Sequence, residues 1–136
     1  MRQDMVVRRM AKRTAALALL ATVTVWALPA QAATGEMTVA AFLGKYEALK
    51  KKGLAALTSP DVKLLKAEGE AAGQAYLARM RADRAAGRPP HSCGPAKARI
   101  GQGEFIAGVQ KYPVTLRDQI TLKMAVADMM RKKYPC

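Results

Sequence analysis

The first 32 residues constrain the fold most strongly, because they have the pattern of an export signal and so would not belong to the folded domain. Residues 1–13 hold five basic residues and one acid, and the uncharged run 14–28 (TAALALLATVTVWAL) follows them. This run is short for a membrane span, which needs about 20 apolar residues. Pro29 interrupts it before Ala30-Gln31-Ala32, which has the small-x-small pattern of a cleavage site. We therefore predict a signal peptide over residues 1–32, cleaved between Ala32 and Ala33.

The expected location is the periplasm, reached by the general secretory route, with secretion from the cell as second choice. Two alternatives stay open: Arg8-Arg9 allow a twin-arginine signal, and the basic flank would suit an uncleaved membrane anchor.

Residues 33–136 must then form the whole domain. They hold 18 Lys and Arg against 9 Asp and Glu, a net charge of +9. This charge favours an acidic partner, but no nucleic acid is expected, because no recognition motif accompanies the basic residues.

The chain has only two cysteines, Cys93 and Cys136, and both lie in the part predicted to be exported. An oxidising compartment allows one pairing within a monomer, so we predict a Cys93–Cys136 disulfide. Closing a loop with a sequence separation of 43 residues should stabilise the fold by about 4 kcal/mol. The functional alternative is a catalytic thiol at Cys93, because His91 stands two residues away.

Apolar spacing and capping residues predict an all-α, compact four-helix domain with one intramolecular disulfide and no strand. The first helix follows Thr38 as N-cap and ends at three lysines before Gly53. The second begins at Ser59-Pro60-Asp61 and runs to about residue 86, with an expected buried row formed by Val62, Leu65, Gly69, Ala72, Tyr76 and Met80. Residues 54–58 are either a connector or a further turn.

The third helix is predicted over residues 102–111, ending at Pro113. Thr115 is the expected N-cap of the fourth, with Asp118 in capping-box spacing. Its main apolar row comprises Leu116, Ile120, Met124, Ala127, Met130 and Tyr134, and a second row comprises Leu122, Val126 and Met129. Two apolar rows predict either a central, widely buried helix or a dimer or partner surface, because methionine-rich faces adapt to partners.

Signals for catalysis are missing from the sequence. His91 is the only histidine, so a zinc or di-iron site is not expected. Gly101-Gln102-Gly103 lacks the Lys-Ser/Thr that completes a phosphate-binding loop. Glu68 and Glu70 are two positions apart on a helix, so their carboxylates diverge. We predict that the protein is not an enzyme and needs no cofactor.

Basic residues gather at three predicted helix ends. Those proposed as a partner-binding surface are Arg79, Arg81, Arg84, Arg88, Arg131, Lys132 and Lys133, and residues 50–52 form a third basic group. A solvated surface that complements the helix dipoles is the alternative interpretation.

Several segments of the sequence resemble the Rap/Tai family of type VI secretion immunity proteins. They are Met37-Thr38 leading into Ala41-Phe42-Leu43, residues 73–80 (GQAYLARM), Cys93-Gly94-Pro95, and the C-terminal RKKYPC of residues 131–136. The resemblance implies a small, helical, disulfide-bonded periplasmic protein, often a dimer. It also implies a function, inhibition of a peptidoglycan-cleaving amidase effector by occlusion of its active site, but it assigns no inhibitory residue.

Two functions from other classes stay open. One is a periplasmic chaperone, suggested by an all-helical, basic chain with a methionine-rich apolar face. The other is binding of an anionic cell-envelope polymer, suggested by the net charge of residues 33–136.

Overall fold

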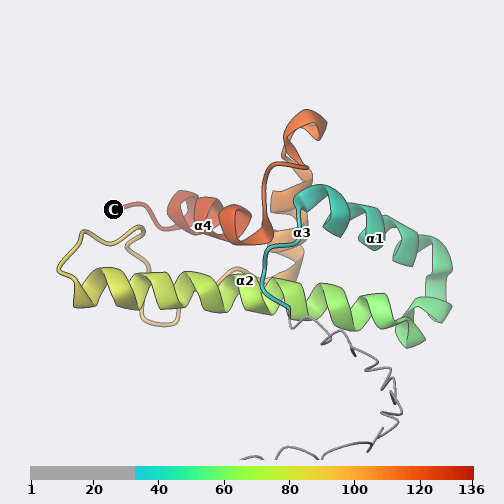
Figure 1. Ribbon diagram of the computed structural model, residues 1–136, viewed down its shortest axis with the longest axis horizontal. Coiled ribbons are helices and arrows are strands. Elements are labelled where there is room, and N and C mark those ends of the chain that lie inside the picture. Colours follow the sequence, from blue (N-terminus) through green and yellow to red (C-terminus); the bar gives the residue numbers. More distant parts are fainter. Residues whose placement is uncertain (1–32) are drawn as a thin grey trace, which may run out of the picture. The chain divides into compact units, whose positions relative to one another are not determined.

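The computed structural model describes residues 33–136, so the predicted signal peptide, residues 1–32, lies outside the described residues. Four α-helices form the domain (Figure 1): α1 (Val39–Lys52), α2 (Pro60–Ala85), α3 (Gln102–Gln110) and α4 (Leu122–Lys133). Two short 3₁₀ helices, η1 (Gly53–Thr58) and η2 (Val114–Leu116), connect them. Within residues 33–136 there is no strand beyond one isolated bridge between Thr38 and Thr121. The all-α prediction is confirmed.

No helix within residues 33–136 combines the length and the apolar character that crossing a membrane requires. The longest, α2, runs beneath the other three in Figure 1, and α4 makes the most extensive contact with it. The largest fully buried side chains are Val39, Val109 and Leu122, from α1, α3 and α4. The core therefore lies where these three helices meet above α2.

Local signals placed the ends of α1 and the start of α2 correctly. The hydroxyl of Thr38 accepts the Ala41 N–H at 3.2 Å, and Gly53 ends α1 with φ of 55°. Pro60 opens α2 as predicted, but Ser59 makes no capping bond and its buried hydroxyl has no hydrogen-bond partner. Residues 54–58, left undecided by the sequence, belong to η1, which ends at Thr58.

The predicted start of the fourth helix at Thr115 is wrong. The α4 helix begins at Leu122, and Thr121 caps it by accepting the Met124 N–H at 3.4 Å. The carbonyls of Arg117 and Ile120 accept N–H groups from the first turn of α1, at 3.0 and 2.8 Å. In a continuous helix these two carbonyls would accept N–H groups of their own helix. Because they accept N–H groups of α1 instead, no continuous helix runs through residues 117–120.

The burial of α4 also differs from the expected rows. The buried residues are Leu122, Ala125, Val126 and Met130, whereas Met124 of the expected main row is 54% exposed. The face that α4 turns toward α2 therefore combines Leu122 and Val126 of the second row with Met130 of the first. A helix with two apolar rows can bury either one, and contact with α2 and α3 decides which.

The segment before α1 is held against α2 by a buried carboxylate. Glu68 is 7% exposed and accepts N–H groups from Thr34, Gly35 and Met37, at 3.2, 2.9 and 3.3 Å. Gly35 has φ of 74°, and a Cβ on it would lie 2.7 Å from the Cα of Ala72. We call Glu68 together with Thr34, Gly35 and Met37 the N-terminal clamp.

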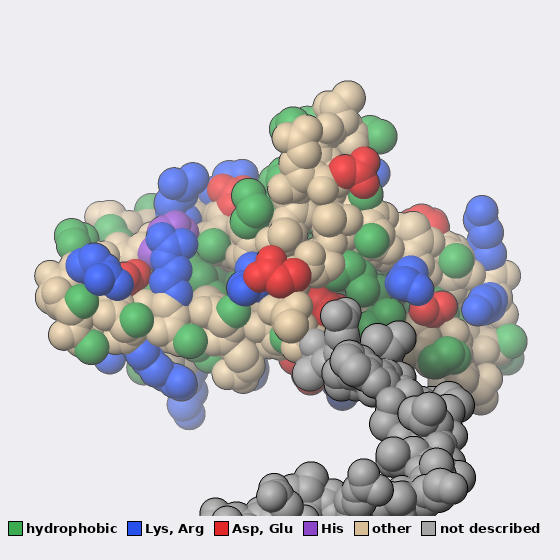
Figure 2. Space-filling model, in the orientation of Figure 1, with side chains coloured by type: hydrophobic (Ala, Val, Ile, Leu, Met, Phe, Trp, Pro, Cys, Tyr) green, Lys and Arg blue, Asp and Glu red, His purple; other side chains and the backbone are tan. Residues whose placement is uncertain are grey.

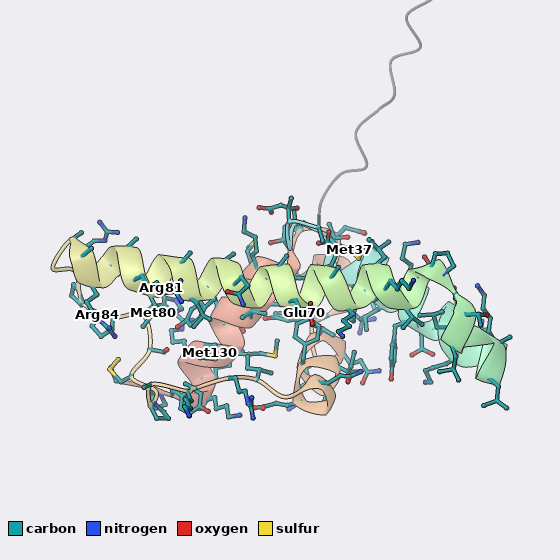
Figure 3. The ribbon with its side chains drawn as sticks, turned by 90° about the horizontal axis from the view of Figure 1, so that it is seen from below. Met37, Glu70, Met80, Arg81, Arg84 and Met130 are labelled. Atoms are coloured by element: carbon teal, nitrogen blue, oxygen red, sulfur yellow. A yellow bond between two sulfur atoms is a disulfide. The ribbon has the colours of Figure 1, made fainter. Side chains whose placement is uncertain are left out.

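The predicted disulfide joins Cys93 to Cys136, with 4.9 Å between the Cα atoms. The alternative of a catalytic thiol at Cys93 is therefore wrong. The bond ties the end of the chain to the loop between α2 and α3, and the Cys93 N–H also donates to the Tyr134 carbonyl at 2.9 Å. Seen from below, this loop runs alongside α2 with α4 behind the space between them (Figure 3).

Candidate functional site

A large apolar groove lies along α2. Its volume is about 1010 Å³, and all four α-helices, η1 and the loop before α3 contribute to its lining. Its α2 wall extends from Val62 to Leu77, which at 1.5 Å per residue is about 22 Å. Ala98, Arg99 and Ile100 from the disulfide-linked loop line it as well. The residues lining it are mainly apolar, as in small-molecule and peptide sites.

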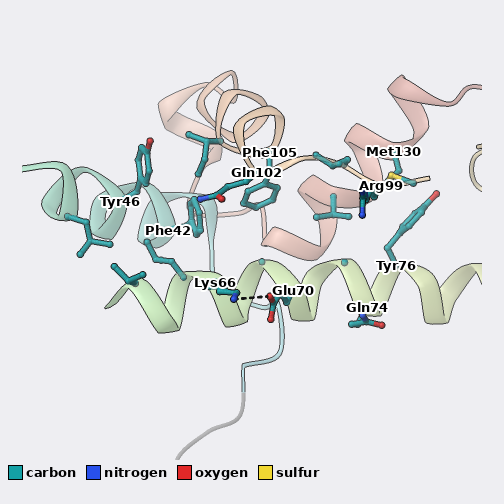
Figure 4. Close-up of a pocket in the computed structure, with 18 of the residues that line it drawn as sticks. Phe42, Tyr46, Lys66, Glu70, Gln74, Tyr76, Arg99, Gln102, Phe105 and Met130 are labelled. Atoms are coloured by element: carbon teal, nitrogen blue, oxygen red, sulfur yellow. Dashed lines mark ion pairs between the residues drawn. The ribbon is translucent and has the colours of Figure 1, made fainter. Parts of the chain in front are cut away.

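The floor of the groove is built from core side chains. Phe42 of α1 packs edge-on against Phe105 of α3, with 5.4 Å between ring centroids. Val126 and Met130 of α4 continue this surface and are 6% and 5% exposed. Figure 4 shows Phe42 and Phe105 on one side and Met130 on the other, above α2. The floor is thus made of residues that the fold already holds in place.

Two glycines, Gly69 and Gly73, form part of the α2 wall. A Cβ built on either would have no heavy atom of a neighbouring group within 4 Å. Glycine inside a helix is less favourable than alanine by about 1 kcal/mol. No packing contact in residues 33–136 requires either glycine. The fold alone therefore does not explain why α2 has glycine at these positions instead of a residue that favours the helix.

The charged residues lining the groove are mostly basic. They are Lys50, Lys66 and Arg99, with Glu70 as the one acid of the lining. Lys66 contacts Glu70 only loosely, at 3.9 Å, and both side chains are mostly exposed (dashed line in Figure 4). No carboxylate of residues 33–136 lies within ion-pair distance of Arg99, whose carbonyl accepts from Lys133. Lys50 is paired with Glu47 at 3.2 Å, so Arg99 is the lining cation that remains without an acidic partner among residues 33–136.

A second exposed apolar feature is the turn between α3 and α4, residues 113–119, which we call the α3–α4 turn. It contains η2, and Figure 1 shows it at the end of α3, well away from α2. Val114 is 73% exposed and Leu116 is 43% exposed. Large apolar side chains at a protruding turn are available for contact with another molecule.

Hydrogen bonds fix the shape of this turn. The Arg117 side chain donates to the carbonyls of Tyr112 and Gln110, at 2.8 and 2.9 Å. The Leu116 N–H donates to the Pro113 carbonyl at 2.9 Å, and the Arg117 carbonyl accepts the Ala40 N–H. The turn therefore presents its apolar side chains in a set position, which lowers the entropic cost of binding.

The base of the turn is anchored by a polar cluster around Asp128. The Tyr112 hydroxyl donates to Asp128 at 2.9 Å, and Lys132 contacts the same carboxylate at 2.8 Å. The hydrogen bond from Lys132 is the largest cause of the lowered pKa of Asp128, with that from Tyr112 also contributing. Burial, together with donation to the carboxylate, raises the pKa of Tyr112 well above its usual value.

The structure pairs most of the predicted basic surface with acids. Asp83 holds Arg88 at 2.7 Å and Arg79 at 3.8 Å. The partners at the end of α4 are Asp128 for Arg131 and Lys132, and Glu104 for Lys133. Arg81 and Arg84, on α2 near its end (Figure 3), have no ion pair within residues 33–136. Two of the seven residues therefore remain as unpaired cations in this part of the chain.

His91 lies between the two arginine groups. Figure 2 shows blue side chains around the one purple histidine. The positive charges of Arg79 and Arg131 both disfavour the protonated form of His91. Burial is the largest cause of its lowered pKa, and these two arginines add to it. The Tyr76 hydroxyl lies 2.7 Å from the Ser92 hydroxyl and 3.3 Å from His91 Nδ1. Because Ser92 is 4% exposed, this cluster anchors the loop beside Cys93 rather than presenting a nucleophile.

Among residues 33–136 no three potential metal ligands gather in one place. The chain matches no protein-family model, no curated protein and no solved structure. The groove, the N-terminal clamp and the rigid turn were not predicted from the sequence. The one sequence signal for the groove is the pair of glycines, Gly69 and Gly73, inside the second helix, where glycine lowers the helix propensity.

Proposed function

We propose that this protein is an exported, immunity-type inhibitor that binds a peptidoglycan-cleaving amidase effector and blocks its active site. The observation that carries the proposal is the α3–α4 turn, which holds Val114 and Leu116 exposed at a protruding position. An inhibitor that acts by occlusion needs such a preorganised projection, because a rigid segment loses little entropy on entering a cleft. The resemblance of segments such as 131–136 to the Rap/Tai family supplies the class of target.

Two features of the structure favour this function over the alternatives. Five of the seven predicted basic residues are paired with carboxylates, which reduces the positive charge available to an anionic envelope polymer. Of the methionines in residues 33–136, Met124 is the one exposed in the structure, so the methionine-rich face expected of a chaperone is mostly covered. A compact apolar projection fits a single defined partner better than many unfolded clients.

The test begins with capture of envelope proteins on the purified protein, with washes at rising salt. A captured cell-wall amidase is then assayed on peptidoglycan with increasing amounts of the protein. We expect one salt-resistant amidase whose activity falls to near zero at a defined stoichiometry. If no cell-wall hydrolase is captured, or the captured amidase stays active, the proposal is wrong, and a diffuse set of clients would favour the chaperone function.

Variants of the turn locate the inhibitory surface. Val114→Asp and Leu116→Asp place charges on exposed side chains, so the fold should persist while inhibition falls by a factor of ten or more. The matched control is Leu54→Asp, because Leu54 on η1 is 87% exposed and lies on a different turn. Loss of inhibition in the control and not in the turn variants would assign the contact to η1 instead.

A further inference from the structure

We infer that the groove along α2 is a binding site for an acidic amphipathic helix of a protein partner. The inference is independent of the α3–α4 turn, which lies away from α2 and contributes none of the lining residues. It rests on three properties of the groove: its dimensions, the two glycines on its α2 wall, and the sign of its charge.

The dimensions fit a helix lying half embedded. A volume of about 1010 Å³ over a length of about 22 Å gives a mean cross-section of about 45 Å². A helix with its side chains is about 10–12 Å across, so half of its section is about 40–55 Å². A length of about 22 Å accommodates about 15 residues, or four turns. A single acyl chain is much thinner and would leave most of this section empty.

The α2 wall is shaped for close approach of another backbone. Gly69 and Gly73 are one helical turn apart, and the space where their side chains would stand is vacant. Small residues at this spacing allow two helices to pack with their backbones near each other. The partner helix would place its apolar face against Phe105 and against Val62 and Leu77, which line the groove and are 37% and 38% exposed.

The basic residues of the groove favour a partner helix with acidic residues. Arg99 and Lys66 lie on the rim, and Arg99 has no acidic partner within residues 33–136. Acidic residues on the flanks of a bound helix would meet these cations. A second copy of this chain is a poor occupant, because residues 33–136 carry a net charge of +9 and two copies repel each other. Recognition of this kind belongs to the helix-in-groove mode.

The inference is tested with a fluorescein-labelled 15-residue peptide that has leucines on one face and glutamates on its flanks. Its binding to the protein is measured by fluorescence polarisation at several salt concentrations. A peptide with the same leucines and with lysines on its flanks is the matched control. We expect the glutamate peptide to bind at least ten-fold more tightly, with an affinity that falls as salt rises.

Variants place the peptide in the groove. Gly73→Leu should weaken binding at least ten-fold without loss of folding, because the new side chain enters empty space. Gly44→Leu is its control, since Gly44 is also a helical glycine with free space around it and does not line the groove. Arg99→Glu should reverse the preference between the two peptides. Val114→Asp should leave peptide binding unchanged, so failure here and failure of the proposed inhibitor function are separable.

Several results would overturn the inference. Equal binding of both peptides, or unchanged binding by Gly73→Leu, would show that the groove does not select an acidic helix. Binding of palmitate with no binding of either peptide would assign the groove to a lipid. Self-association of the protein that Gly73→Leu abolishes, measured by analytical ultracentrifugation, would assign it to a second copy.

Discussion

The two sides of α2 differ in how closely other parts of the chain approach it. On one side the N-terminal clamp brings Gly35 so near that a Cβ would lie 2.7 Å from Ala72. On the other side Gly73 faces open space in the groove, which is also lined by the loop that Cys93 ties to the end of the chain. The contrast teaches that glycine can have opposite roles at the two sides of one helix: Gly35, in the segment before α1, allows close packing against α2, whereas Gly73 of α2 leaves room that the fold does not use.

The loop beside the groove is held to the end of the chain by the disulfide. Removing this bond should have the largest effect on the free energy of unfolding. Replacing Cys93 and Cys136 by serine should lower the free energy of unfolding by about 4 kcal/mol, because the unfolded chain regains the entropy of a long loop. Urea denaturation with and without dithiothreitol measures it. Equal stability of the oxidised and reduced wild-type protein would contradict the prediction, and the serine variant should not respond to reductant.

The closed side is tested by Gly35→Ala. Alanine there is strained at positive φ and meets the backbone of α2, so the free energy of unfolding should fall by about 2–3 kcal/mol. Thermal and urea denaturation provide the measurement. Gly44→Ala on α1 is the control and should not destabilise, because its Cβ meets nothing. An unchanged stability of Gly35→Ala would mean that the segment before α1 is not held as described.

On the open side of α2, a substitution of glycine by alanine should increase the stability instead of lowering it. Gly73→Ala should raise the free energy of unfolding by about 1 kcal/mol, because alanine favours the helix and its methyl group enters free space. The same denaturation experiment measures the gain. Destabilisation would show that the groove is closed in solution, which would remove the difference between the two sides of α2.

The smallest effect concerns pH at the loop that forms the far wall of the groove. Folding lowers the pKa of His91 below its unfolded value of about 6.5. At a pH between these two pKa values, the unfolded chain binds more protons than the folded chain. Stability should therefore fall as pH drops below about 6.5. Urea denaturation at pH 7.5 and 5.5 measures this, and His91→Asn should reduce the difference. A difference of equal size in that variant would assign the pH dependence to other groups.

Much of the fold was predictable because its signals are local. Pro60 opens α2, Thr38 caps α1, and Gly53 ends α1, since each acts on backbone groups within one helical turn. The disulfide was predictable for a different reason, because the chain has only two cysteines and these allow a single intramolecular pairing.

The candidate sites depend on contacts between residues far apart in the chain. In the sequence Glu68 is only one of two diverging carboxylates, yet in the structure it accepts three N–H groups from a segment more than 30 positions away. Five members of the predicted basic surface lie in ion pairs with three carboxylates, those of Asp83, Asp128 and Glu104. A composition count cannot show which charges are paired, because pairing depends on where each helix ends in space.

The sequence was sufficient for the helical class, for most helix ends and for the one covalent link, because capping, periodicity and cysteine count act without knowledge of the rest of the fold. Tertiary structure decided where α4 begins, which of its apolar rows is buried, and that α2 keeps an open groove on one side. The physical reason is the same in each case. The carbonyl of Ile120 can bond either within its own helix or to α1, and the space beside Gly73 is filled or left empty only when the helices have packed.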